Sequence, residues 1–371
     1  MRILFAADEL HFPDNVGGSR MDIHDLALTF GEQGHDVEVL AAASGRTRLL
    51  GYRALETVTG MHVLNRVDTL NGYPTTRCGS WQLLRSLRAS VASRPPDLLI
   101  TQSAGSGRLA GVASRQGVPA VIRLASAGEA EMLAAEARDD PELDTAIQSP
   151  LVTLAAVSRF VATLAADLLG ISPAVIYPPV RLQACVAPRR EPDHITFINP
   201  IPLKGLEVAL QVAQLLPQRR FVFVEAWNIP GAQRKALDRE MSKLPNVTFR
   251  PRSVGLADVY RSTAVLLAPS QCPEAFSRVV LEACANGIPV LASRVGGVPE
   301  AMGESGVLLA ATDQPEHWAR AIEEILADRN RFASLASRAT ANARRPEFKM
   351  ESIAAEYLRL AGTAADSAAP H

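Results

Sequence analysis

The segment "APSQCPEAFSRVVLEACANGIPVLASRVGGVPEAMGESGVLL", Ala268 to Leu309, decides the fold class of this chain. An apolar run ends at Ala268, a loop rich in proline and serine follows, and an apolar helical pattern then continues to Gly287. A second apolar run leads into the glycine pair Gly296–Gly297. This order of strand, loop, helix, strand and glycine turn predicts a repeating unit of a parallel α/β sheet.

Two carboxylates in this segment stand eight positions apart. Glu274 belongs to the loop, whereas Glu282 lies within the predicted helix Ser277–Ala285, for which Ser277 is the expected N-cap. The N–H groups at the start of a helix favour a phosphate group, and Glu282 would lie roughly 8 Å along the axis from Ser277. We therefore predict a diphosphate at the helix start, with a carboxylate on each side of it binding hydroxyl groups. Without its surroundings, the same spacing would more often join two unrelated surface acids.

Length and composition limit the class of protein. The chain has 371 residues, which suggests about two domains, and its formal net charge of −1 gives no overall attraction for nucleic acid or for an acidic membrane. The early acids Asp8 and Glu9 argue against a signal peptide, and no apolar run approaches the length of a membrane span. Scattered cysteines without CxxC spacing favour neither a zinc site nor disulfides, so we expect a cytoplasmic protein.

Short apolar runs alternate with helical patterns along the chain, which predicts two doubly wound parallel sheets in tandem. The predicted strands are Arg2–Ala6, Asp36–Leu40, Met61–Arg66, Leu98–Thr101, Ala120–Leu124, Thr153–Val157, Val175–Tyr177, Ile195–Ile198, Phe221–Val224, Val247–Arg250, Val265–Ala268, Val290–Ala292 and Val307–Leu309. The predicted helices are Met21–Gln33, Trp81–Ala92, Leu109–Gln116, Arg159–Leu169, Gly205–Leu215, Gly231–Lys243, Ala257–Arg261, Ser277–Ala285, Glu316–Ala327 and Met350–Ala361.

The alternation is interrupted at Pro178–Pro179 and in the polar stretch Pro188–Asp193, where we place the domain boundary. The prediction is an N-terminal domain over residues 1–180, a C-terminal domain over residues 181–345, and a last helix within residues 346–371 that returns to the N-terminal domain. Ligands are expected at the carboxyl ends of the strands and in a cleft between the domains.

The opening segment resembles the signature of the retaining glycosyltransferases of family 4, which have the GT-B fold. The matching positions are Pro269, Ser270, Glu274, Phe276, Glu282, Ala283, Ala285, Gly287, Pro289, Val290, Gly296, Gly297 and Glu300. Further similarity lies in Leu256–Ser270, Lys204–Gly205, Val157–Phe160 and an N-terminal pattern that begins at Gly17–Gly18. The resemblance implies two Rossmann-like α/β domains facing a cleft, with the acceptor bound to the N-terminal domain and a nucleotide-sugar to the C-terminal domain.

The implied activity is transfer of a hexose-type sugar from a nucleotide-sugar to an acceptor hydroxyl group with retention of configuration. The acceptor would be a small molecule, a glycan or a lipid-linked molecule. Members of the family need neither a metal nor a separate cofactor, because a lysine and helix N-termini take the place of the metal. No nucleic-acid partner is expected, and contact with a membrane surface is not favoured.

The resemblance also implies roles for single residues. Glu274 would bind hydroxyl groups of the transferred sugar and support the charged transition state. Lys204 would neutralise the diphosphate leaving group, and Glu282 would hold the ribose hydroxyl groups. The remaining donor contacts are assigned to Phe276, Ser277, Arg278, Asn199, Arg252 within Arg250–Ser253, Gly17 and Gly18.

Four places depart from the family pattern. Asn199 stands where the family usually has an arginine, five positions before Lys204, and Ser277 stands where it has a glycine. The pair Ala125–Ser126 occupies the place of a histidine, and Glu225–Asn228 replaces a glycine-rich turn. These departures leave two alternatives open: a nucleotide-sugar-binding pseudoenzyme of the same fold, and a nucleotide-sugar epimerase.

Other conspicuous residues are assigned structural roles. The basic, partly apolar helix Trp81–Ala92 is expected to pack on its sheet rather than on a membrane. The acidic run Arg138–Asp144 is expected to be a solvated loop, and Cys272 a packing residue rather than a nucleophile. Among the histidines, His11 is kept as a reserve candidate because it precedes the glycine pair.

Overall fold

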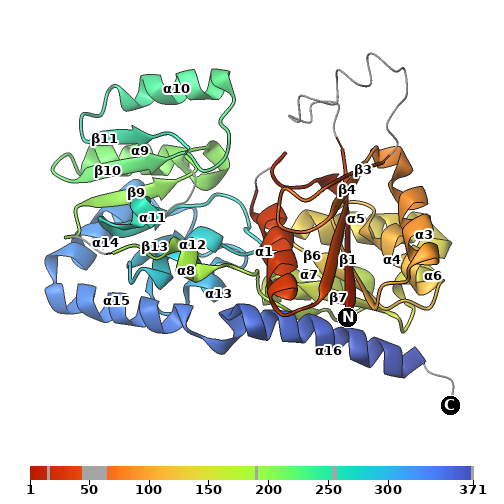
Figure 1. The fold of residues 1–371 in the computed structure, drawn as a ribbon. Helices are drawn as coiled ribbons and strands as arrows, with labels where there is room; N and C mark the ends of the chain where they lie inside the picture. The colour runs from red at the N-terminus through yellow and green to blue at the C-terminus, as the bar shows by residue number, and fades with distance from the viewer. Residues whose placement is uncertain (15–16, 44–64, 189–190, 253–256, 369–371) are drawn as a thin grey trace. The chain divides into compact units, whose positions relative to one another are not determined.

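The structure is a computed structural model that describes residues 1–14, 17–43, 65–188, 191–252 and 257–368. The chain divides into two compact units, coloured along the sequence in Figure 1. Unit 1 consists of Met1–Pro179 together with Lys349–His371, and unit 2 consists of Val180–Phe348. Each unit is a sheet with helices packed on it, which confirms the predicted class of two doubly wound α/β domains.

Unit 1 is built on an eight-stranded sheet in the order β3-β4-β2-β1-β5-β6-β7-β8. Its strands are β1 (Arg2–Leu10), β2 (Asp36–Ala42), β3 (Asn65–Asp68), β4 (Thr75–Cys78), β5 (Leu98–Gln102), β6 (Ala120–Leu124), β7 (Val152–Ala156) and β8 (Ala174–Val175). Its helices are α1 (Gly18–Glu32), η1 (Ser80–Gln82), α3 (Leu83–Ser93), α4 (Ser106–Ser114), α5 (Ala127–Asp139), α6 (Pro141–Ile147), α7 (Arg159–Leu169) and α16 (Met350–Ala368).

The expectation of a purely parallel sheet is wrong at one edge of unit 1. Strand β3 pairs with β4 in the antiparallel direction, whereas the other described pairs of this sheet are parallel. The short connection between β3 and β4 cannot hold the crossover that parallel neighbours require. Most of the predicted strand Met61–Arg66 lies outside the described residues.

The core of unit 1 joins the sheet to α1 and α16. Phe5 on β1, Phe30 on α1 and Tyr357 on α16 are fully buried in one apolar cluster, and the rings of Phe5 and Phe30 are 6.2 Å apart. The last helix, blue in Figure 1, therefore completes unit 1, although the whole of unit 2 lies between this helix and the rest of unit 1 in the sequence.

Unit 2 has a six-stranded sheet in the order β11-β10-β9-β12-β13-β14, and its described pairs are parallel. Its strands are β9 (His194–Ile198), β10 (Arg220–Val224), β11 (Val247–Arg250), β12 (Thr263–Ala268), β13 (Val290–Ser293) and β14 (Gly306–Leu309). Its helices are α8 (Leu182–Cys185), η2 (Pro202–Lys204), α9 (Leu206–Leu215), α10 (Gly231–Met241), α11 (Ala257–Tyr260), α12 (Arg278–Ala285), α13 (Val298–Met302), α14 (Pro315–Ala327), α15 (Arg329–Ala343) and η3 (Pro346–Phe348). Because the strands are parallel, their carboxyl ends share one edge of the sheet.

The acidic run Arg138–Asp144 is not a loop, contrary to the expectation. Helix α5 ends at Asp139, and Asp140 is the N-cap of α6, where its side chain accepts hydrogen bonds from the N–H groups of Glu142 and Leu143 at 3.1 and 3.3 Å. A proline at the first position and acids in the first turn are typical of a helix start. The charged residues of this run therefore mark the end of α5 and the start of α6.

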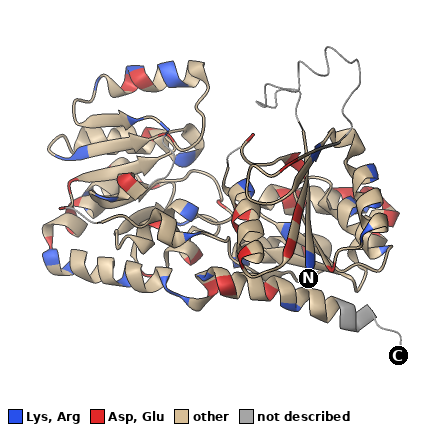
Figure 2. Ribbon diagram, viewed as in Figure 1, with Lys and Arg blue, Asp and Glu red and all other residues tan. Residues whose placement is uncertain are grey.

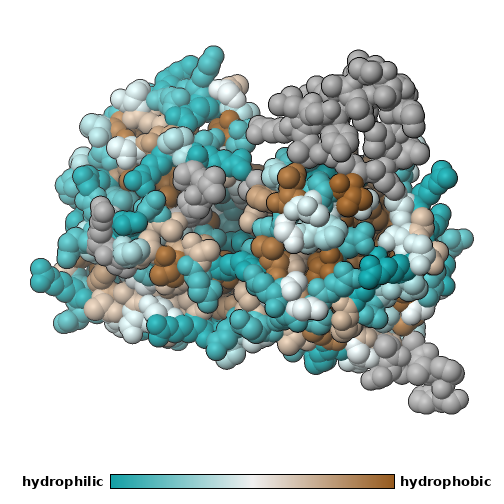
Figure 3. Space-filling model, in the orientation of Figure 1, coloured by the Kyte–Doolittle hydropathy of each residue, from teal (hydrophilic) through white to brown (hydrophobic). Residues whose placement is uncertain are grey.

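The basic helix predicted over Trp81–Ala92 is η1 followed by α3. Leu83, Leu87 and Val91 of α3 are buried, which confirms the packing role of the apolar face of α3, whereas Trp81 in η1 is 80% exposed. On the face drawn in Figure 3, exposed hydrophobic residues form small groups among hydrophilic ones, and Figure 2 shows both signs of charge mixed along the helices. No helix in the described part of the chain is both long enough and apolar enough to cross a membrane.

Candidate active site

Three loops at the carboxyl edge of the unit 2 sheet meet around Glu274. They follow the adjacent strands β9, β12 and β13, and Glu274 lies in the loop after β12. The N–H group of Gly297 donates to the carbonyl oxygen of Glu274 at 2.7 Å. Gly296 has φ +52°, and a Cβ atom there would lie 2.1 Å from the same oxygen. Only glycine permits this approach, which explains the glycine pair after β13.

A second glycine brings the loop after β9 against the loop after β12. Gly205 has φ +85°, and an added Cβ atom would lie 2.0 Å from the carbonyl oxygen of Pro269. The N–H group of Gln271 donates to the carbonyl oxygen of Leu203 at 3.0 Å, and the thiol of Cys272 donates to that oxygen at 3.7 Å. Cys272 therefore helps to pack the two loops together.

Lys204 and Glu274 form an ion pair where these loops meet. Lys204 Nζ lies 2.9 Å from Glu274 Oε2, and the two side chains are only 18% and 9% exposed. The other carboxylate oxygen, Oε1, accepts a hydrogen bond from the hydroxyl of Ser270. A cation and a hydroxyl donor thus fix a carboxylate that has little contact with water. The structure brings together the two residues to which catalytic roles were assigned.

Glu282 lies within α12, and its side chain is held from a neighbouring helix. Its Oε2 accepts a hydrogen bond from the hydroxyl of Tyr260, the last residue of α11, at 2.8 Å. Burial and the adjacent Glu282 carboxylate raise the pKa of Tyr260 well above its usual value, so the hydroxyl keeps its proton and donates. A carboxylate accepts up to about four hydrogen bonds, so the bond from Tyr260 does not exhaust its capacity.

Helix α12 begins where the sequence predicted, but without the expected side-chain cap. Ser277 is the N-cap residue and is buried, yet its hydroxyl makes no capping hydrogen bond. Arg278 is the first helical residue, and the ring of Phe276 packs edge to face on Phe348 at 5.9 Å. The backbone from Phe276 to Arg278 therefore forms a helix N-terminus directly after the Glu274 loop, which is where a phosphate is predicted.

Asn199 shapes the loop that follows β10. Its φ is +60°, a conformation that asparagine tolerates better than most residues. Its Oδ1 accepts hydrogen bonds from the N–H groups of Ala226 and Trp227 at 3.0 and 2.7 Å. The side-chain oxygen is thus committed to this loop, and only the NH₂ group can donate to a phosphate.

The same loop is tied to the end of β11. Glu225 Oε1 accepts a hydrogen bond from the N–H group of Ile229 at 2.9 Å, and its Oε2 accepts one from the N–H group of Arg252 at 3.3 Å. The Arg252 side chain is exposed, and Ser253 lies outside the described residues. This arrangement fixes the backbone of Arg252 and leaves its guanidinium group at the surface beside the loop.

Gly17 and Gly18 lie in unit 1, where α1 begins. Gly17 is the N-cap residue and Gly18 the first helical residue. In the first turn, Arg20 pairs with Glu9 of β1 at 2.8 Å, and burial raises the pKa of Glu9 although the charge of Arg20 opposes that shift. The glycine pair thus stands beside an ion pair within unit 1. Its predicted relation to the donor stays a prediction.

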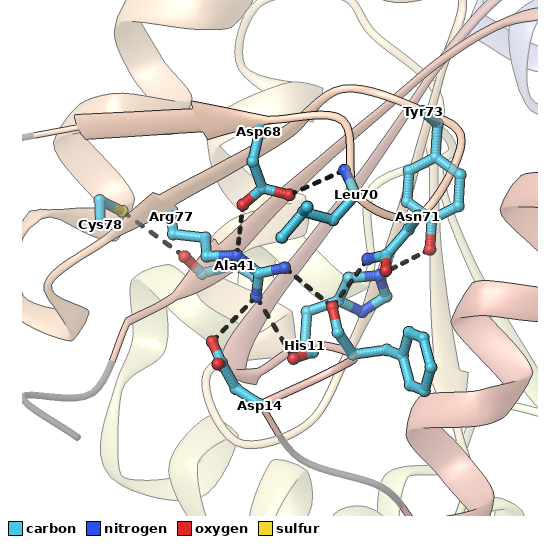
Figure 4. A network of polar contacts seen from close by, with 10 residues as sticks. His11, Asp14, Ala41, Asp68, Leu70, Asn71, Tyr73, Arg77 and Cys78 are labelled. Atoms are coloured by element: carbon cyan, nitrogen blue, oxygen red, sulfur yellow. Dashed lines mark hydrogen bonds and ion pairs between the residues drawn. The ribbon is translucent and has the colours of Figure 1, made fainter. Parts of the chain in front are cut away.

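Buried Arg77 holds the loop between β1 and α1 (Figure 4). It pairs with Asp14 at 3.2 Å and with Asp68 at 2.8 Å. It also donates to the carbonyl oxygens of His11 and Phe12 at 3.3 and 2.8 Å. This network fixes the backbone that leads toward the glycine pair.

His11 belongs to the same buried region. Its Nε2 lies 2.8 Å from the hydroxyl of Tyr73, and Nδ1 of His24 lies 2.8 Å from that hydroxyl as well. Burial, together with the positive charge of Arg77, lowers the pKa of His11 to about 3. The ring is therefore neutral at neutral pH, and its contacts are those of a structural residue.

The region after β6, where the resemblance expects a histidine, is the capped start of α5, whose N-cap residue is Ser126. The N–H group of Glu129 donates to the hydroxyl of Ser126 at 3.1 Å, and the N–H group of Ala125 donates to Glu129 Oε2 at 2.6 Å. Burial raises the pKa of Glu129 to about 7. Arg123 is fully buried and pairs with Asp22 of α1, so it stabilises the core of unit 1.

Sequence reasoning missed three residues that shape the site of unit 2: Ser270, Tyr260 and Trp227. Ser270 is part of the family signature and Tyr260 lies in the similar segment Leu256–Ser270, so both could have been found there. Trp227 stood out only as part of a turn that departs from the pattern. Lys204 Nζ lies 5.1 Å from the centre of the Trp227 ring.

No group of three or more His, Cys, Asp and Glu side chains in the described ranges is placed to hold a metal ion. The four cysteines of the chain are free thiols: Cys78, Cys185, Cys272 and Cys284.

Two family profiles match the chain. The profile described as "Glycosyltransferase Family 4" matches residues 16–184. The profile described as "Glycosyl transferases group 1" matches residues 192–328, which include the Glu274 loop and α12. Between them they account for most of the sequence.

Curated relatives carry a related description. The chain is 28% identical to the D-inositol 3-phosphate glycosyltransferase of Salinispora arenicola over 386 aligned residues, which cover 90% of this chain and 85% of that protein. It is 35% identical to the protein of the same name from Rhodococcus erythropolis over 164 residues, which cover 40% of this chain and 37% of that protein.

Solved structures share the fold over nearly the whole chain. The crystal structure of Anabaena HepE in complex with UDP superposes with a TM-score of 0.75 at 19% identity and covers 97% of this chain and 99% of that one. Sucrose-phosphate synthase from Thermosynechococcus elongatus superposes with a TM-score of 0.71 at 20% identity, and the match covers 97% of this chain and 98% of that one. This likeness confirms the expected fold class, GT-B.

Proposed function

We propose that this chain, which belongs to glycosyltransferase family 4, transfers a hexose from a nucleoside diphosphate sugar to an acceptor hydroxyl group with retention of anomeric configuration and without a metal ion. The chain is an enzyme of the glycosyltransferase class.

The Lys204–Glu274 pair is the observation that supports the proposal most strongly. Its 2.9 Å separation places an ammonium group and a carboxylate at the same edge of the sheet, close to the start of α12. A diphosphate would compete with Glu274 for the ammonium group, because both are anions. Glu274 would then turn its oxygens to the hydroxyl groups of the sugar, which are the natural donors to a carboxylate.

The chemical step breaks one bond and forms one at the anomeric carbon. The bond from this carbon to the diphosphate oxygen breaks, and the bond to the acceptor oxygen forms on the same face of the sugar. The departing phosphate oxygen accepts the proton of the acceptor hydroxyl. Lys204 and the N–H groups that open α12 stabilise the negative charge of the leaving group, as a metal ion would in other enzymes.

Glu282 is assigned to the ribose of the donor. Two hydroxyl groups of a ribose can donate to one carboxylate, and Tyr260 holds that carboxylate from the protein side at 2.8 Å. The segment Arg250–Ser253 is assigned to the base, as the resemblance to the family implies, and Glu225 fixes the Arg252 backbone beside the loop after β10. Acceptor recognition is assigned to unit 1.

The donor class draws support from the similar proteins. HepE has been crystallised with UDP-glucose, and the catalytic domain of a starch synthase from Arabidopsis thaliana with ADP and acarbose. The first of these ligands is a nucleoside diphosphate hexose, and the second complex contains a nucleoside diphosphate. We therefore expect a nucleoside diphosphate hexose as the donor of this chain, with the base to be identified by experiment.

Proton NMR tests the proposal with the full-length protein, a panel of nucleoside diphosphate hexoses, and a panel of polyol, sugar-phosphate and glycan acceptors. We expect the product, or free sugar released when water takes the place of the acceptor, to keep the anomeric configuration of the donor. The same rate is expected with and without EDTA. A product of inverted configuration would refute retention. Loss of activity in EDTA that Mg²⁺ restores would refute metal independence.

A further inference from the structure

Trp227 stands beside the cationic end of Lys204. Lys204 Nζ lies 5.1 Å from the centre of the indole ring and 2.9 Å from Glu274 Oε2. This distance lies within the range in which a cation is attracted to the face of an aromatic ring. The indole is 40% exposed, so it is not a core residue that contacts Lys204 only by packing.

The loop that carries Trp227 is held by three side-chain hydrogen bonds to its backbone. Asn199 Oδ1 accepts from the N–H groups of Ala226 and Trp227, and Glu225 Oε1 accepts from the N–H group of Ile229. Asn199 adopts φ +60° to make these contacts. Such bonds fix the backbone on both sides of the indole, so the ring is presented from a built loop.

An aromatic ring beside the ammonium group of Lys204 helps to keep that group in one position. The ammonium group ends a flexible four-carbon chain and loses rotational freedom when it binds a single anion. Glu274 holds Lys204 from one side, and a diphosphate that displaces Glu274 would remove that constraint. A cation–π contact is not displaced by an anion, because the ring offers no site for one.

We infer that Trp227 is a positioning residue of the donor site. It holds the Lys204 ammonium group where the diphosphate of the donor binds, and Asn199 builds the loop that presents it. The inference rests on the proposed function, since it assigns the diphosphate to Lys204. It gives Asn199 a role other than direct neutralisation of phosphate.

A double-mutant cycle tests this inference. Affinity for UDP, ADP and GDP is measured by titration calorimetry for the wild type, W227L, K204M and the double variant, with circular dichroism and thermal unfolding to verify folding. W227L keeps an apolar side chain but removes the aromatic face. We expect it to raise the Kd of the preferred nucleotide roughly three- to thirtyfold. In the K204M background we expect the same change to have little further effect.

Two more variants sharpen the test. W227F keeps an aromatic face and should recover most of the affinity that W227L loses. W81L is the matched control, because Trp81 is 80% exposed, lies in unit 1 and makes no contact assigned to the site. Its affinity should equal that of the wild type.

The outcomes separate the inference from the proposed function. Equal losses from W227L in both backgrounds would overturn the inference alone, because Trp227 would then act without Lys204. Failure of W227F to recover affinity would do the same. If no nucleoside diphosphate binds to the wild type, both the inference and the proposed function are wrong.

Discussion

Lys204 Nζ lies 2.9 Å from Glu274 Oε2, although the two residues come from loops after different strands of the same sheet. The contact depends on Gly205, whose missing Cβ lets the first loop touch Pro269 of the second. The pair that we propose to be catalytic is thus assembled by backbone packing.

Glu274→Gln should separate turnover from binding. The amide keeps the size of the side chain but cannot carry the negative charge that supports an electron-poor transition state, so we expect kcat to fall about a hundredfold or more. Nucleoside diphosphate affinity should be unchanged or higher, because Lys204 loses an internal anion that competes with phosphate. Steady-state kinetics and titration calorimetry measure the two effects. A large loss of affinity with normal turnover would contradict the assignment.

Glu282→Gln should act mainly on nucleotide affinity. Hydrogen bonds to a charged group contribute about 1.5–3 kcal/mol, so Kd for a nucleoside diphosphate should rise at least about tenfold. Tyr260→Phe removes the 2.8 Å bond to Glu282 Oε2 and should weaken binding by a smaller factor. Titration calorimetry measures the affinity of both variants. A larger loss of affinity in Tyr260→Phe than in Glu282→Gln would contradict the assignment of Glu282 to the ribose.

Gly296→Ala should damage both stability and donor affinity. An added Cβ would lie 2.1 Å from the Glu274 carbonyl oxygen, so the Glu274 loop must move. Gly34→Ala is the matched control, since Gly34 also has positive φ but has no atom within 4 Å of an added Cβ. Backbone strain alone should cost about 1–2 kcal/mol in each variant. In urea unfolding, Gly296→Ala should lower the free energy of unfolding clearly more than Gly34→Ala. Equal decreases in the two variants would contradict close packing at Glu274.

His11 should make stability depend on pH. Its pKa is lowered by burial from 6.5 to about 3, so the folded state binds a proton more weakly than the unfolded state. The stability that neutral His11 contributes is therefore complete above pH 6.5 and is lost as pH falls toward 3. In that window the free energy of unfolding falls by about 1.4 kcal/mol for each pH unit. When the pH is lowered from 7.5 to 5.5, the free energy of unfolding measured in urea should fall more for the wild type than for His11→Gln. Equal losses would contradict a buried, neutral His11.

The fold was predictable from the sequence wherever apolar runs mark strands covered on both faces. Strand β4 was missed because Thr75 and Arg77 are polar, and Arg77 is buried with Asp68 and with Asp14, which is 63 positions away, as its ion-pair partners. Helix α15 was missed because its buried positions, Leu335, Ala339, Asn342 and Ala343, include only one large apolar side chain. Both elements depend on tertiary partners that periodicity does not reveal.

The site was predictable only as far as a linear signature reaches. Glu274 and Glu282 sit in one continuous segment, and Lys204 is marked by the glycine that follows it. The role of Asn199 could not be read in this way, because its oxygen bonds to backbone groups 27 and 28 positions away. Contacts between a side chain and a distant loop leave no periodic trace in a sequence.

Titration calorimetry of the wild type and Glu282→Gln with a panel of nucleoside diphosphate hexoses tests the assignment of the donor site to unit 2 most directly. We predict that at least one donor binds to the wild type and that its Kd rises about tenfold or more in the variant. Binding of every donor with the same affinity by both proteins, or of none by the wild type, would contradict it.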